Sequence, residues 1–135
     1  MTEADNIEVY RRFIEEGVGV GKLELVDELL APGTAIPTLP SDFEPTPQGL
    51  KTMNGAFRAG FPDLRADVEE VFAVGDWVAA RLTWSGTNTG ELFGQPPTGA
   101  SVAVTELEIV RVEEGRIVEL RQLADISSLM AQLAG

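Results

Sequence analysis

The sequence predicts a single α+β domain in which helices come first and an antiparallel sheet follows. Apolar residues recur at helical spacing up to residue 59, and from Arg65 onward they follow the two-residue period of strands. Helices followed by a run of strands are typical of the α+β class, in which a curved sheet wraps the helices and leaves a pocket open on one side. The length of 135 residues fits one such domain.

Two helices are expected at the start of the chain. Thr2-Glu3-Ala4-Asp5 resembles a capping box, and an apolar stripe that includes Tyr10 runs from there up to Gly17. The stretch 22–30 repeats the helical pattern, and the breaker pair Pro32-Gly33 ends it. We expect two amphipathic helices joined by a flexible, glycine-rich connection.

The segment that follows is expected to be irregular. Residues 37–47 hold four prolines among Thr, Ser, Asp and Glu, which is typical of a loop and makes this segment a candidate lid. A short strand at 34–39 is the only regular element expected before the next helix. That third helix is expected over 48–59, where Gly60 ends it.

Four strands are expected in the second half of the chain, at 65–74, 77–87, 101–112 and 116–124. The connections Gly75-Asp76 and Glu113-Glu114-Gly115 are short enough for hairpins. The segment 88–99 is longer and rich in glycine and proline, so we expect a loop at the rim of the sheet. A short helical run at 127–133 ends the domain.

The chain contains no histidine and no cysteine. These absences exclude a Ser-His or Cys-His nucleophile, an ordinary zinc site and a histidine proton shuttle. A carboxylate is therefore the expected agent of any proton transfer.

The charge balance disfavours several partners. The formal net charge is −12, which repels a phosphate backbone and an anionic membrane surface, so we expect no nucleic-acid or membrane partner. The N-terminus lacks the basic and apolar regions of a secretory signal, and no apolar run reaches the ~20 residues of a spanning helix. The expected location is the cytoplasm.

Motifs typical of one enzyme family are spread over nearly the whole chain. They are Phe61-Pro62-Asp63-Leu64, Gly75-Asp76, the run 86–99 (GTNTGELFGQPPTG), Arg111, Glu114-Gly115-Arg116-Ile117, and Asp125 followed seven residues later by Gln132-Leu133. Together they resemble the SnoaL-like polyketide cyclases. The resemblance implies a cone-shaped α+β barrel of the NTF2-like superfamily, with a deep apolar pocket and often a homodimer formed through the sheet.

The resemblance also implies a mechanism. The Asp that matches Asp125 is the general acid/base of an intramolecular aldol closure in these cyclases, and no metal or organic cofactor is needed. Four positions depart from the family pattern. Asn88 and Leu120 stand where these cyclases often carry His, and Glu106 and Glu108 stand where SnoaL itself has Gln and His.

Asp125 supports two interpretations on the residues alone. Asp before Ile126 is a favoured N-cap of the C-terminal helix. If the last strand is regular to its end, alternation instead places Asp125 on one face with Glu119, Arg121, Leu123 and Ile117, from which its carboxylate projects into the pocket as a base.

Glu106 and Glu108 lie on one face of the third strand among valines. Two acids in an apolar stripe are costly if buried, so either the face is wet, with Leu107 and Ile109 in the core, or the pair serves the pocket. Arg81 is a candidate cross-strand partner of either acid.

Four further residues are candidates for substrate binding. Arg121 can bind an anionic or phenolic group, with a surface ion pair to Glu119 as the alternative. Tyr10, the sole tyrosine, belongs to the core stripe or reaches the pocket with its hydroxyl. On the rim loop, Asn88 is a turn residue or a ligand contact, and Phe93 is the aromatic residue expected to touch a ligand.

The leading hypothesis is a cofactor-independent cyclase that acts on a hydrophobic polyketide-like carbonyl compound with Asp125 as general acid/base. One alternative is epoxide opening of the limonene-epoxide-hydrolase type, using Asp125, Arg81 and either Glu106 or Glu108. A non-catalytic small-molecule carrier is the other alternative. We also expect a homodimer through an apolar outer sheet face that includes the runs 78–80 and 107–110.

Overall fold

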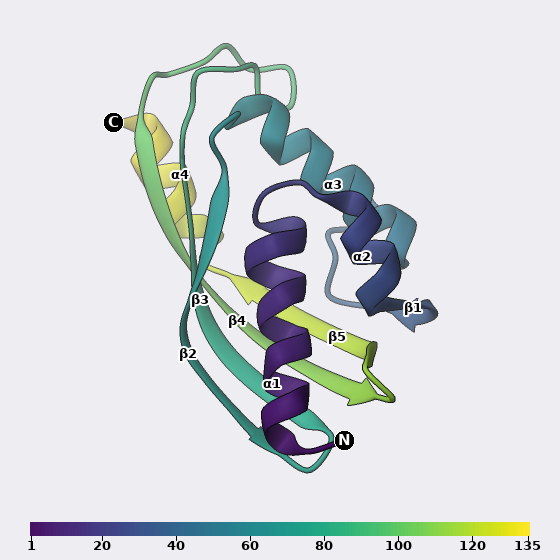
Figure 1. Cartoon of the computed structure of the whole chain (residues 1–135). Coiled ribbons are helices and arrows are strands. Elements are labelled where there is room, and N and C mark those ends of the chain that lie inside the picture. The colour runs from purple at the N-terminus through teal and green to yellow at the C-terminus, as the bar shows by residue number, and fades with distance from the viewer.

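A computed structural model, which describes residues 1–135, has a curved five-stranded sheet with α1, α2 and α3 on one side (Figure 1). The strand order is β1-β5-β4-β3-β2, and the predicted α+β class is confirmed. No helix in it has both the length and the apolar character needed to cross a membrane. In chain order the elements are α1 (Glu3–Arg11), η1 (Arg12–Val18), α2 (Leu23–Leu29), β1 (Leu30–Ala35), α3 (Pro47–Gly60), β2 (Arg65–Val74), β3 (Trp77–Thr87), β4 (Ser101–Glu113), β5 (Arg116–Ala124) and α4 (Ile126–Ala134).

The first helix begins with the predicted capping box. The backbone N–H of Asp5 donates to Thr2 Oγ1 at 3.0 Å, and the backbone N–H of Thr2 donates to Asp5 Oδ2 at 2.8 Å. After α1 the helix widens into η1, a π-helix that closes with a 2.7 Å bond from Gly19 N–H to the carbonyl of Ile14. In a π-helix each hydrogen bond spans one residue more than in an α-helix, and helical periodicity in the sequence does not reveal this difference.

The first strand lies earlier in the chain than the sequence predicts. β1 covers Leu30–Ala35 and pairs in parallel with β5, where the hydroxyl of Thr34 donates to the carbonyl of Ile117 at 3.0 Å. The candidate strand at 34–39 is therefore wrong, apart from its first two residues. The irregular stretch beyond it is tied to the sheet by Thr38, whose Oγ1 accepts the N–H of Gln122 at 3.0 Å.

The four long strands form an antiparallel meander at the predicted positions, with β4 one residue longer than expected. Between β4 and β5 the chain turns through Glu114 and Gly115, both with positive φ (49° and 79°), as a two-residue hairpin requires.

A bulge near the start of β5 changes which residues face inward. Arg111 pairs with Glu119 and Val112 pairs with Ile117, so Val118 is an extra residue in the ladder. Ile117 is buried, but beyond the bulge the inward residues have even numbers. The predicted common face of Ile117, Glu119, Arg121, Leu123 and Asp125 is therefore wrong.

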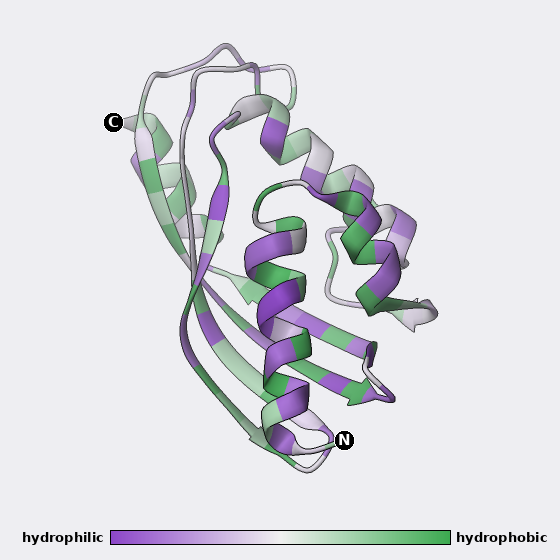
Figure 2. Cartoon of the chain, viewed as in Figure 1, coloured by the Kyte–Doolittle hydropathy of each residue, from purple (hydrophilic) through white to green (hydrophobic).

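The core lies between the helices and the inner sheet face. Apolar and polar residues alternate along β4 and β5, as the bands in Figure 2 show. A cluster of 19 buried residues, including Tyr10, Leu82 and Leu120, fills the space under α1 and α2. A second cluster of six, including Phe61 and Leu129, lies beneath the end of α3 and beside α4.

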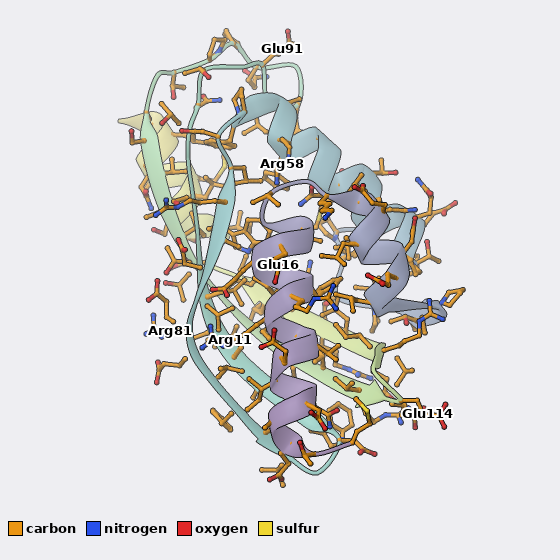
Figure 3. All side chains as sticks on the ribbon, in the orientation of Figure 1. Arg11, Glu16, Arg58, Arg81, Glu91 and Glu114 are labelled. Carbon is orange, nitrogen blue, oxygen red and sulfur yellow. The ribbon has the colours of Figure 1, made fainter.

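The outer face of the sheet carries large exposed apolar side chains. Val78 and Val110 of the two predicted runs are completely buried, whereas Leu107 and Ile109 point outward. Figure 3 shows the labelled Arg81 on this outer side, where it binds Glu70 at 2.6 Å. The exposed apolar residues of the outer face are Phe72, Val74, Trp77, Leu107 and Ile109.

Candidate active site

A cavity of about 230 Å³ opens between α3, the inner face of the sheet and α4. Twenty residues line it and fourteen of these are hydrophobic, so a ligand inside leaves water for a largely apolar environment. The aromatic part of the wall consists of Phe13, Phe57, Phe61 and Trp84. The predicted pocket is therefore present on the helical side of the sheet.

Two carboxyl groups lie at the wall of this cavity. Glu106 and Glu108 are only 7% and 4% exposed, and they project from the inner face of β4. Alternation along β4 fixes this orientation, because Leu107 between them points to the outer face. The arrangement with Leu107 in the core and the two acids in water does not occur.

Each carboxyl group accepts one hydrogen bond from an aromatic donor, Tyr10 being buried and Trp84 partly buried. The hydroxyl of Tyr10 donates to Glu108 Oε1 at 3.0 Å, and the indole Nε1–H of Trp84 donates to Glu106 Oε1 at 3.0 Å. Burial, followed by the charge of Glu108 and the hydrogen bond to it, raises the pKa of Tyr10, so its hydroxyl stays protonated.

The surroundings of Glu108 favour its protonated form. Burial raises the pKa of Glu108 well above its ordinary value, and the neighbouring Glu106 raises it further, whereas the Tyr10 bond opposes the shift. Glu108 therefore keeps its proton to a higher pH than an exposed carboxyl group does.

Three polar residues of the cavity, Thr38, Asn54 and Gln122, are absent from the sequence-based candidates. Gln122 lies directly opposite Glu108 in the ladder, and both residues line the cavity. Asn54 of α3 is buried and donates Nδ2–H to the carbonyl of Val18 at 2.9 Å. Gln122 is identifiable from strand alternation only once the bulge at Val118 is known, and no sequence signal marked Asn54.

Asp125 lies next to the cavity but does not line it. Its neighbours Ala124 and Ile126 are lining residues, whereas Asp125 itself is exposed. Its Oδ1 accepts the N–H of Ser128 at 3.1 Å and so caps α4. The structure thus places Asp125 in the N-cap arrangement, and its catalytic role stays a prediction.

The two arginine candidates lie on the outer face of the sheet. Arg121 is exposed and binds Glu119 at 3.1 Å, in the surface ion pair that was its alternative. Arg81 binds Glu70, and it faces away from Glu106 and Glu108. The predicted pairing of Arg81 with either acid is wrong, and the constellation expected for epoxide opening is not assembled.

Asn88 holds the rim loop together rather than lining the cavity. Its Nδ2 donates to the carbonyls of Gly60 and Gly90, both at 3.0 Å, and its Oδ1 accepts two hydrogen bonds from Thr98. A side chain at Gly90 would place Cβ only 2.0 Å from the carbonyl oxygen of Ala59. Only glycine therefore allows this close approach of the loop to α3.

Phe93 lies on the same loop, outside the cavity wall. It is 57% exposed, and its ring packs edge-on against Phe57 with centroids 5.2 Å apart. Because Phe57 lines the cavity, Phe93 supports the wall from behind. Direct contact between Phe93 and a ligand stays a prediction.

The acidic residues do not gather into a metal-binding cluster. No group of three or more Asp or Glu side chains has the proximity needed to hold a metal ion. The cavity offers two carboxyl groups with an amide opposite, an arrangement suited to proton transfer and hydrogen bonding.

The geometry agrees with comparisons to known proteins. The family model of SnoaL-like polyketide cyclases matches residues 8–133. The chain belongs to this family. The nogalonic acid methyl ester cyclase of Streptomyces nogalater is 31% identical to this cyclase over 116 residues, which cover 84% of this chain and 86% of that relative.

Solved structures agree with this assignment. IdmH of Streptomyces antibioticus, a candidate polyketide cyclase, is 31% identical, with a TM-score of 0.81 and complete coverage of both chains. A candidate polyketide cyclase of Bacillus cereus is 27% identical, with a TM-score of 0.84 and coverage of 96% of this chain and 80% of that one. The predicted NTF2-like fold and the prediction of an enzyme are thereby confirmed.

Proposed function

We propose that this polyketide cyclase closes a ring by intramolecular aldol chemistry, with the Glu106–Glu108 pair transferring the proton. The observation that carries the proposal is the burial of two neighbouring carboxyl groups, each hydrogen-bonded to an aromatic donor, in an otherwise apolar cavity. Two carboxyl groups side by side can supply a base and an acid at the same place. No other titratable side chain lines the cavity.

Glu106 serves as the base in this mechanism. Its carboxylate removes a proton from a carbon made acidic by adjacent carbonyl groups, and the electrons of the C–H bond pass into an enolate. The enolate carbon attacks a second carbonyl carbon of the same molecule. A carbon–carbon bond forms, and the attacked carbonyl becomes an alkoxide.

Glu108 serves as the acid. It donates its proton to the alkoxide, which gives the hydroxyl group of the ring-closed product. Glu106 now holds the proton taken from carbon, and this proton passes to the neighbouring carboxylate of Glu108. The pair returns to its starting state, and the reaction consumes no proton.

The cavity contributes by holding the two reacting carbons together. Enclosure of a flexible chain in the reactive geometry contributes about 7–11 kcal/mol in favourable cases. The aromatic and aliphatic wall also excludes water, which strengthens the charge interactions of the pair.

A neutral ester is the substrate class that fits the charge of this site. The lining residues include no Lys or Arg, and the acid pair is itself negative, so a free carboxylate near it would be repelled. The name of the S. nogalater relative states a methyl ester as its substrate. We therefore assign a methyl ester or another neutral derivative of a polyketide acid to this enzyme.

Conversion of nogalonic acid methyl ester tests the proposal, with ring closure followed by absorbance and chromatography. Glu106→Gln should lower kcat by about 10²–10⁴-fold while the protein stays folded, because the amide cannot accept the proton from carbon. Glu119→Gln, on the outer face of the same sheet, is the matched control and should retain the wild-type rate. Full activity in folded Glu106→Gln would contradict the assignment of the base.

A further inference from the structure

The side-chain amide of Gln122 faces the cavity without a partner in the protein. Gln122 belongs to β5, is half-buried and lies directly opposite Glu108 in the ladder. Its backbone N–H donates to Thr38 Oγ1 at 3.0 Å, whereas no residue forms a hydrogen bond with its side chain. A side-chain amide carries two donor hydrogens, so both hydrogens of Gln122 are available to a ligand.

The other donors of this region are already engaged or face water. Trp84 and Tyr10 each donate to one of the two acids, and Asn54 donates to a backbone carbonyl. Thr38 lines the cavity but is exposed, so water competes for its hydroxyl group. The lining residues include no Lys or Arg. Negative charge that develops on a substrate oxygen therefore meets no cation in the cavity, and Gln122 is the half-buried wall residue whose amide is free to bind it.

We propose that Gln122 is a catalytic residue that donates an amide N–H to the oxygen of the attacked carbonyl group. The proposal rests on the ring closure described above, in which this oxygen becomes an alkoxide. Its negative charge grows as the carbon–carbon bond forms, and a donor already in place lowers the free energy of that transition state. Gln122 gives up no proton, because Glu108 protonates the alkoxide and the amide stays a donor to the resulting hydroxyl group.

The sheet places Gln122 beside the group that delivers the proton. Residues directly opposite each other on antiparallel strands share one face of the sheet, with Cβ atoms about 4.5–5.5 Å apart. One oxygen atom of the substrate can therefore lie within hydrogen-bond reach of both Glu108 and Gln122. The bulge at Val118 gives Gln122 its inward orientation, and the bond to Thr38 holds its backbone in place.

A neutral donor also suits the neighbouring acids. A Lys or Arg at this position would lie next to Glu108 and favour its ionised form, so the acid would lose the proton that it has to deliver. An amide binds a negative oxygen without adding a charge to the wall of the cavity.

Gln122→Met tests the proposal, because methionine keeps the length of the side chain and removes both amide hydrogens. Gln48→Met is the matched control, since Gln48 is exposed on α3 and lies outside this cavity. Both variants are assayed with nogalonic acid methyl ester. We expect kcat of Gln122→Met to fall by about 10²–10³-fold with little change in KM, because the hydrogen bond strengthens as the charge develops. Gln48→Met should keep the wild-type rate.

A second measurement detects the hydrogen bond itself. The infrared spectrum of bound nogalonic acid methyl ester is recorded in Glu106→Gln and in the double variant that adds Gln122→Met. A carbonyl group that accepts a hydrogen bond absorbs at lower wavenumber, so one ketone band should move to higher wavenumber when the amide is removed. Gln122→Leu takes the place of Gln122→Met in both measurements if the methionine variant does not fold.

The outcomes separate this proposal from the proposed function. The role of Gln122 is overturned by an unchanged kcat in folded Gln122→Met, by a rise in KM alone, by an equal loss in Gln48→Met, or by an unshifted ketone band. Full activity of folded Glu106→Gln overturns the proposed function instead. In that case kcat of Gln122→Met still decides the role of the amide, since a donor to the attacked oxygen acts with any base.

Discussion

Replacement of Glu108 by Gln should change how the free energy of unfolding depends on pH. Gln keeps the shape of the side chain and still accepts the hydrogen bond from Tyr10, but it cannot ionise. Burial and the neighbouring Glu106 raise the pKa of Glu108 above its ordinary value of 4.5 in the folded protein. The native state therefore binds more protons than the unfolded state between pH 4.5 and the folded pKa.

The sign and size of the effect follow from this difference in protonation. A raised carboxyl pKa contributes stability that is fully present below pH 4.5 and is lost as the pH rises through the folded value. While Glu108 stays protonated only in the native state, the loss is about 1.4 kcal/mol per pH unit. Glu108→Gln should lack this component, so its stability relative to wild type should increase steadily from pH 5 upward.

Urea unfolding of the wild type and the variant at several pH values from 5 to 9 measures the effect. Glu119→Gln is the control with the opposite sign, because hydrogen bonds from Arg121 and Arg111 lower the pKa of Glu119. The stability that Glu119 contributes is present above its unfolded pKa and is lost as the pH falls through the folded value. Parallel curves for wild type and Glu108→Gln would refute the raised pKa of Glu108 in the folded protein.

Two further predictions concern Asp125 and assembly. Asp125→Asn should leave stability and turnover close to wild type, since Asn also caps helices. Asp125→Ala should lose about 0.5–2 kcal/mol of stability in thermal unfolding. A loss of kcat of about 10²–10⁴-fold in folded Asp125→Asn would instead identify Asp125 as the base. We expect a homodimer through the outer sheet face, with light scattering giving twice the 14.5 kDa chain mass and Ile109→Glu giving the monomer. A wild-type protein that scatters as a monomer at micromolar concentration would refute this interface.

The sequence predicted the strands better than the faces of the last strand. Strand bounds follow from apolar alternation and turn residues, and the bounds predicted in this way agree with those of β2 to β5. Alternation counted from the buried Ile117 assigns Asp125 to the cavity side, but the extra residue Val118 reverses that assignment. A bulge of one residue has no clear sequence signature. The predicted side of the sheet for Asp125 was therefore wrong, and only the pairing of β4 with β5 shows this.

The acid pair could be foreseen in part. Two Glu residues at spacing two in an apolar stripe indicated either a wet face or a functional pair, and burial in the structure decides between them. Their partners could not be foreseen, because Tyr10 is 98 positions distant from Glu108 in the chain, and Trp84 reaches Glu106 diagonally across two strands. Local periodicity carries no information on such distant contacts.

The π-helix η1 makes the chemistry of the cavity sensitive to chain length. Each turn of η1 is closed by a bond to the carbonyl five residues earlier instead of four, so deletion of one residue would change the rotation of α1 relative to α2. Tyr10 would then leave the side of the helix from which its hydroxyl meets Glu108. A change of one residue in the length of η1, far from the acids in the chain, would therefore disturb the hydrogen bond that Glu108 accepts at the wall of the cavity.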